Sequence, residues 1–264
     1  MISYLALSII GVISGLVKGF TSSSGVMIVV PLLKMFFPFY MQNSIGTSLF
    51  VDFLSSVAIV FVFYRYRNVD FKTGIWVAIG PILGAQLGAR ISIGVPELPL
   101  EIAFALLMII TGFSLVRGNV DREEVAKKFQ KLIKFHTFSE RVLTAVALGF
   151  LVGVVSGMLG AGGGIMMLLI LVFVLGFGLQ KGLGTAIFIM SLTSLSGTVG
   201  YSLYGKVAFD TGVIISIGAV IAGVLGALFI NKISEEKLNK IVGGIFLLLG
   251  LGMIISLLAN LHIV

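Results

Sequence analysis

Apolar residues dominate two long parts of the chain, and a charged stretch at 117–141 separates them. Six apolar segments have the length of a membrane helix, at 44–64, 74–94, 100–116, 182–203, 212–231 and 239–259. Helices of about 20 residues match a hydrocarbon core of about 30 Å. The pattern therefore predicts an all-α polytopic membrane protein.

Each half begins with a longer apolar stretch, 3–37 in the first and 143–176 in the second. One helix of about 35 residues would be about 52 Å long, which exceeds the bilayer core. Polar or glycine-rich sequence interrupts both stretches, at 18–25 and at 156–164. Because such clusters favour a break, each stretch is expected to form a broken, re-entrant helical hairpin.

The two halves repeat one pattern at a constant offset of 138 residues, as between Gly46-Thr47 and Gly184-Thr185. Glycine, threonine and aromatic positions coincide in this register without a gap, which indicates a duplication. The predicted organisation is a first membrane repeat at 1–117, a basic amphipathic linker at 118–141 and a second membrane repeat at 142–264.

Basic residues indicate how the repeats are oriented. If each repeat has one re-entrant hairpin and three transmembrane helices, the second repeat is inverted, and only Lys34, Arg90 and Lys206 lie outside. If the hairpin crosses the bilayer instead, the repeats are parallel and six basic residues lie outside. Because basic residues concentrate on the cytoplasmic side, we expect two inverted repeats and a cytoplasmic linker on the anionic leaflet.

Composition supports lipid as the solvent and limits the partners. Hydrophobic residues make up 58% of the chain and charged residues 11%, whereas a soluble domain has about a quarter charged. The net charge is +7, but the basic residues lie between apolar segments, where membrane topology alone would place them. No nucleic-acid partner is therefore expected. Cysteine is absent, which excludes disulfides and thiolate metal sites. No metal or cofactor is expected.

Lys18 and Asp52 are the charged residues that lie well inside apolar segments, whereas the others within these ranges lie close to a segment end. An ionisable group at the bilayer centre costs about 2.5–3.5 kcal/mol on insertion scales and is therefore a functional candidate. Lys18 either binds a substrate anion or extends to an interface. Asp52 either carries a coupling proton or pairs with Lys18, and its repeat counterpart is Met190.

The interruptions in the two hairpins carry the donors for an anion site. The second arm of each hairpin offers unpaired backbone N–H groups and the positive end of a helix dipole. The predicted substrate-binding residues are Lys18, Thr21, Ser22, Ser23, Ser24, Gly25, Thr47, Ser48, Gly160, Gly162, Gly163, Gly164 and Thr185. Two alternatives stay open: Gly160–Gly164 forms only a tight turn, and the hydroxyls of Thr47, Ser48 and Thr185 cap helices.

These residues resemble the sulfite exporter TauE/SafE family of permeases. The resemblance covers nearly the whole chain outside the linker and rests on five motifs, at 15–33, 45–49, 84–89, 153–164 and 183–187. It implies transport of sulfite, sulfonates or related organosulfur anions, coupled to protons. Serines at 22–24 and Leu169 depart from the family pattern, and the departures bear on the substrate more than on the fold.

A secondary transporter of small anions in the cytoplasmic membrane is thus the leading interpretation. An anion channel and a permease for small carboxylates are the alternatives. An enzyme is not expected, because a serine nucleophile at Ser156 would need a general base, and the two histidines lie in the linker and the C-terminal tail. The partners are then a small anion, protons and lipid, and the oligomeric state, including a homo-oligomer, stays open.

Overall fold

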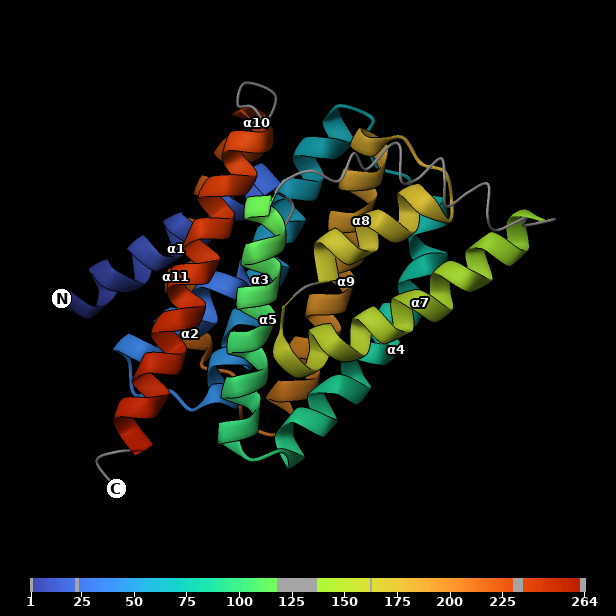
Figure 1. Ribbon diagram of the computed structural model, residues 1–264. Coiled ribbons are helices and arrows are strands. Elements are labelled where there is room, and N and C mark those ends of the chain that lie inside the picture. Colours follow the sequence, from blue (N-terminus) through green and yellow to red (C-terminus); the bar gives the residue numbers. More distant parts are fainter. Residues whose placement is uncertain (1, 22–23, 118–136, 162, 230–234, 262–264) are drawn as a thin grey trace.

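The computed structural model describes residues 2–21, 24–117, 137–161, 163–229 and 235–261, and these residues form ten α-helices (Figure 1). The helices are α1 (Ile2–Thr21), α2 (Val26–Phe36), α3 (Met41–Arg65), α4 (Phe71–Gly94), α5 (Glu97–Arg117), α7 (Phe138–Leu159), α8 (Gly163–Phe173), α9 (Leu179–Ser202), α10 (Phe209–Phe229) and α11 (Glu235–Leu261). Residues 118–136 of the predicted basic linker lie outside this description, and 138–141 belong to α7.

Seven of these helices are long and apolar enough to cross a membrane, namely α3, α4, α5, α7, α9, α10 and α11. The outward side chains of α5 and α11 are large and apolar, and include Ile110, Phe113, Leu248 and Ile255. Such surfaces suit lipid and not water, since an extended apolar face would associate in water. The predicted all-α polytopic membrane fold is confirmed.

The first apolar stretch is divided into α1 and α2, which lie side by side as a hairpin. The Ser14 hydroxyl in α1 donates a hydrogen bond to the Gly25 carbonyl oxygen at 3.1 Å, just before α2 begins. At the other end of α2, Leu33 belongs to the same apolar cluster as Leu7. The short helix α2 therefore returns along α1 and does not continue it.

The second apolar stretch is divided in the same way into α7 and α8. Gly160 ends α7 in the left-handed conformation, with φ 72°, which a side chain would strain. A Cβ on Gly149 would lie 3.2 Å from the terminal carbon of Met167, so α8 returns along α7. Both hairpins thus turn within the interruptions seen in the sequence, although the first four residues of each interruption still belong to α1 or α7.

Close backbone contacts join each hairpin to the other half of the chain. A Cβ on Gly15 in α1 would overlap the carbonyl oxygen of Ala219 in α10. A Cβ on Gly84 in α4 would likewise overlap the carbonyl oxygen of Phe150 in α7. Small residues permit such close packing of helix backbones in lipid, where apolar surface gains nothing from leaving water.

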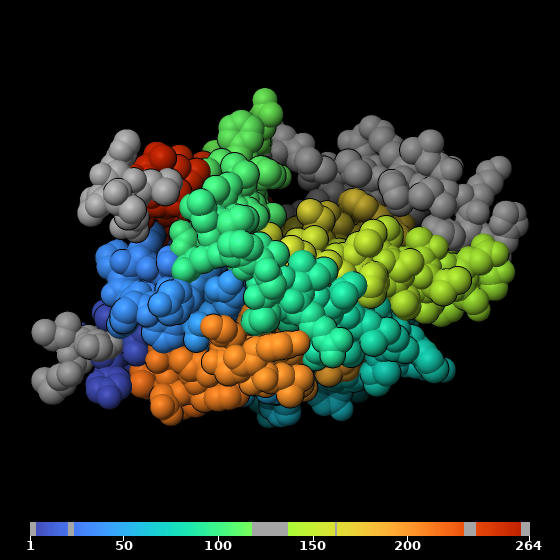
Figure 2. Space-filling model, turned by 90° about the horizontal axis from the view of Figure 1, so that it is seen from below, coloured from blue at the N-terminus to red at the C-terminus, as the bar shows by residue number. Residues whose placement is uncertain are grey.

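Helices α3 and α9 cross the centre of the molecule and run antiparallel. Gly46 near the start of α3 lies against the carbonyl oxygen of Lys206, which follows the end of α9. Likewise, Gly184 near the start of α9 lies against the carbonyl oxygen of Asn68, which follows the end of α3. The two contacts involve positions that match in the repeat. Figure 2 shows one end of the molecule, where the orange segment around the end of α9 lies beside blue and teal parts of the first half.

The close contact at Gly84 can be tested by a single methyl group. Gly84→Ala is expected to lower the Tm of the purified protein by at least about 3 °C, because the new Cβ must push α4 away from the α7 backbone. Gly244→Ala is the matched control, because nothing lies within 4 Å of its Cβ position in α11. Its Tm should stay constant or rise with the better helix propensity of alanine. Equal Tm values for the two variants would contradict the close packing of α4 and α7.

Candidate functional site

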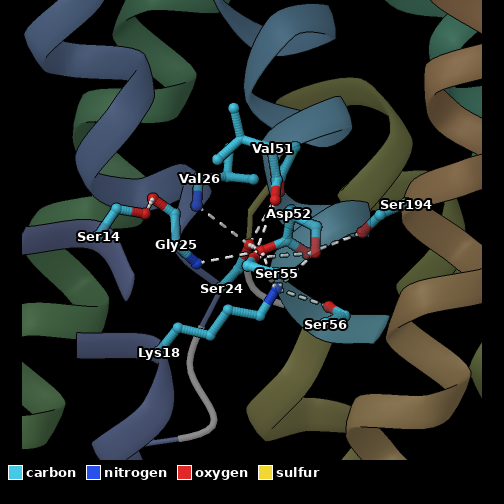
Figure 3. A network of polar contacts seen from close by, with 11 residues as sticks. Ser14, Lys18, Ser24, Gly25, Val26, Val51, Asp52, Ser55, Ser56 and Ser194 are labelled. Atoms are coloured by element: carbon cyan, nitrogen blue, oxygen red, sulfur yellow. Dashed lines mark hydrogen bonds and ion pairs between the residues drawn. The ribbon is translucent and has the colours of Figure 1, made fainter. Parts of the chain in front are cut away.

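A buried ion pair lies where the first hairpin meets the central helix α3 (Figure 3). Lys18, in the last turn of α1, places its Nζ 2.7 Å from Oδ1 of Asp52, near the middle of α3. The side chains are 4% and 1% exposed, so lipid and water are both excluded. The pairing foreseen as one role for Asp52 is therefore present.

The Lys18 ammonium has further acceptors along α3. Its Nζ donates to the Asp52 carbonyl oxygen at 2.7 Å, to Ser56 Oγ at 2.6 Å and to Ser55 Oγ at 3.1 Å. An ammonium has three N–H groups, so these acceptors and the carboxylate use all of its donors. Lys18 thus points into the protein and not toward an interface.

Three further donors, from α9 and from the tip before α2, bind the Asp52 carboxylate. Ser194 Oγ of α9 donates to Oδ2 at 2.7 Å, while the Gly25 amide and Ser24 Oγ donate to Oδ1 at 3.2 Å and 3.3 Å (Figure 3). A carboxylate at this place interacts favourably with the positive N-terminal end of α2. The helix end at which we expected a substrate anion therefore already holds an anion supplied by the protein.

The hydrogen bonds of this network reduce the free-energy cost of burying the Lys18–Asp52 ion pair. A buried charge with one partner removed destabilises a protein by about 3–5 kcal/mol, whereas a neutral pair with all of its hydrogen bonds costs far less. Both charges here are neutralised by each other and surrounded by hydroxyl and amide dipoles. Lys18 and Asp52 therefore form one unit, and neither can change its charge without affecting the other.

The tips of the two hairpins meet next to this unit. Ser24 Oγ, beside α2, is 3.4 Å from the carbonyl oxygen of Gly160, which ends α7. A Cβ on Gly160 would lie 2.7 Å from Cγ1 of Val26. The structure thus brings together the predicted residues Lys18, Ser24, Gly25 and Gly160, while Gly163 and Gly164 begin α8 on the other side of the same tip.

Two threonines of the predicted site have a different role. Thr47 Oγ1 accepts a hydrogen bond from the Ala208 amide just before α10, and Thr185 Oγ1 accepts one from the Asp70 amide just before α4, each at 3.0 Å. Each threonine therefore holds a loop of the opposite half and does not cap its own helix. Ser48 donates to the Ser44 carbonyl oxygen of its own helix at 2.6 Å.

Ser22, Ser23 and Gly162 lie outside the described residues, and Thr21 is described only as the last residue of α1.

Three serines of the network were not predicted. Ser55 and Ser56 follow Asp52 by three and four positions, so they share its helix face, and this spacing could have identified them. Ser194 contacts Asp52 from a position 142 residues away. It is the repeat counterpart of Ser56, so the register of the duplication could have placed it opposite that face.

Two comparisons with known proteins identify relatives of this chain. The model of the family described as sulfite exporter TauE/SafE matches residues 7–253. The chain is 26% identical to the probable membrane transporter protein YunE of Bacillus subtilis, with 94% of this chain and 96% of that protein covered. It is 24% identical to a probable membrane transporter protein of Methanocaldococcus jannaschii, with 94% of each covered.

No solved structure matches the chain at a significant level. The family match includes Lys18 in the first hairpin, Asp52 in the central helix α3, and the second hairpin. This polytopic membrane protein therefore belongs to the sulfite exporter TauE/SafE family.

Proposed function

We propose that the protein is a secondary transporter that moves small anions across the cytoplasmic membrane, with sulfite and organosulfonates as the substrate class. The observation that carries this proposal is the meeting of two helical hairpin tips beside a buried, neutralised ion pair. Irregular backbone inside a membrane occurs where it is buried in protein or lines a cavity for a solute. The family match and the relatives named as probable membrane transporters support the same class.

The proposal includes two repeats that are inverted across the bilayer. In support, the equivalent helices α3 and α9 run antiparallel, and so do α5 and α11, where Gly112 lies against Gly243 and Gly250 lies against Ile109. Secondary transporters commonly combine inverted repeats with broken helices whose ends face a substrate near the midplane. The linker between the repeats then lies on the cytoplasmic side, as the positions of the basic residues indicate.

The chemistry of the hairpin tips favours an anion over a cation. Helix N-termini at Val26 and Gly163 present amide groups and positive dipole ends toward the tips. A cation site would use several carboxylates and carbonyl oxygens. Asp52 is the carboxylate at these tips among the described residues, and Lys18 neutralises it.

Protonation of Asp52 gives a route to coupling. When Asp52 is charged, it accepts hydrogen bonds from both the Lys18 ammonium and the Gly25 amide, so neither group is available to a substrate anion. A proton on Asp52 removes that negative charge and leaves Lys18 and the start of α2 with net positive potential, which attracts an anion. Among the described residues, Lys18 is the titratable group that contacts the Asp52 carboxylate. The other donors to this carboxylate are the hydroxyls of Ser24 and Ser194 and the Gly25 amide.

Transport by the purified protein in liposomes tests this function. An inwardly directed proton gradient is expected to drive saturable uptake of radiolabelled sulfite, and unlabelled methanesulfonate or acetate in excess reports which anions compete. Protein-free liposomes are the control. A current that does not saturate and ignores the proton gradient would indicate a channel, and the absence of flux for sulfite, sulfonates and carboxylates would refute anion transport.

Asp52→Asn separates coupling from binding. The amide resembles the protonated acid in shape and charge, so we expect gradient-driven uptake to be lost while exchange of labelled for unlabelled anion persists, with a lower Tm. Asp210→Asn, at an exposed carboxylate in the first turn of α10, is the matched control and should retain both activities. An equal loss of uptake and exchange in Asp52→Asn would show that Asp52 has only a structural role.

A further inference from the structure

The second hairpin lacks the internal anion that the first hairpin holds. At the repeat offset of 138 residues, Ser156 replaces Lys18 and Met190 replaces Asp52, while Gly163 corresponds to Gly25. The first half therefore supplies both charges of its site, and the second half supplies neither.

Ser156 is a buried hydroxyl without a hydrogen-bond partner among the described residues, and it is 1% exposed. Its Oγ lies 3.2 Å from the position of a Cβ on Gly163, so it faces the first residue of the 11-residue helix α8. Buried polar groups without a partner are rare in proteins and call for an explanation. A missing ligand at the start of α8 supplies one.

The start of α8 offers the donors that such a ligand needs. The first amide groups of a helix have no partner within the helix, and the glycines at 163 and 164 carry no side chain that would shield them. In the first half the equivalent amide, that of Gly25, donates to a carboxylate oxygen at 3.2 Å. The fold thus already shows an oxyanion bound at the corresponding place.

Met190 covers this position. A Cβ on Gly163 would lie 2.6 Å from the Met190 Sδ, so the thioether stands against the start of α8. A thioether is a weak acceptor, and its unbranched side chain changes rotamer readily. Met190 can therefore exclude water from the helix end while the site is empty and move aside for a ligand.

We propose that Ser156 and the amides of Gly163 and Gly164 bind the oxyanion head of the transported substrate, with Met190 displaced. This inference rests on the proposed anion transport and assigns its substrate subsite to the second hairpin. The first hairpin then serves as the coupling half, in which Asp52 occupies the equivalent place.

The surroundings also select the charge of the ligand. In the described residues of α8, in α7 after Arg141 and in α9 after Lys181, no side chain carries a charge. The Lys18–Asp52 unit beside the tips supplies one net positive charge when Asp52 is protonated. The cost of moving an ion out of water rises with the square of its charge, so one positive charge and the helix dipoles compensate a dianion poorly. The subsite therefore favours singly charged heads, such as hydrogen sulfite, a sulfonate or a carboxylate, over sulfate.

Ser156→Ala tests the subsite in the full chain reconstituted in liposomes. We expect the concentration of radiolabelled sulfite for half-maximal uptake to rise about tenfold, while the Tm without substrate stays constant or rises because an unpaired buried hydroxyl is removed. Ser156→Cys keeps a weaker donor of similar size, so its half-maximal sulfite concentration should lie between those of the wild type and Ser156→Ala. Ser216→Ala, at a buried serine that bonds to its own helix in α10, is the matched control and should behave as the wild type.

The outcomes separate this inference from the proposed function. If the wild type takes up sulfite and Ser156→Ala has the same half-maximal concentration, the proposed subsite is wrong. Anion transport itself would still stand. No uptake by the wild type would instead refute anion transport. Methanesulfonate should compete with sulfite at least tenfold better than sulfate does, and equal competition by sulfate would overturn the selection of single charges.

Discussion

The ion pair between Lys18 and Asp52 is the interaction on which the centre of this protein depends. It joins α1 to α3 through the two charges, and Asp52 extends the connection to α2 and α9. Neither charge could remain buried alone, because an unpaired ion in a dry interior costs several kcal/mol. The position of the first hairpin, the packing of the central helices and the charge state of the interior are thus linked in one network.

Comparison of the two halves gives this network its functional meaning. The same backbone arrangement occurs twice, namely a hairpin with a glycine at the start of its second arm or directly before it. In one copy the helix start is occupied by a carboxylate of the protein, and in the other it faces an unpaired hydroxyl and a thioether. In the transport that we propose, the copy with the internal anion serves proton coupling and the neutral copy binds the substrate.

Much of the fold could be predicted from the sequence because its physical cause is local. Membrane length, glycine-rich interruptions and the offset between repeats identify the apolar helices and the two broken stretches, and the rarity of charge identifies Lys18 and Asp52. The pairing of Lys18 with Asp52 is one of two alternatives from the sequence, but contacts between the halves could not be predicted in the same way. Thr47 and Thr185 hold loops of the opposite half, and Ser194 reaches Asp52 across the central helix pair. Such contacts depend on how the halves pack.

The prediction that Lys18 binds the substrate directly also depends on packing. The sequence shows a cation beside a helix start. It does not show that an aspartate 34 positions away accepts hydrogen bonds from both the Lys18 ammonium and the Gly25 amide. For Ser156 the sequence suggested a nucleophile at most, and its unpaired hydroxyl became apparent only beside the start of α8.

A double-mutant cycle on the ion pair tests the account most directly. Thermal unfolding is measured for Lys18→Met, for Asp52→Asn and for the variant that carries both, in the same detergent and at neutral pH. Each single variant should be less stable by about 3 kcal/mol, because one charge remains buried without its partner, and the double variant should recover most of that loss. A double variant whose loss of stability equals the sum of the single losses would show that the two charges act independently, which contradicts the network at the centre of this protein.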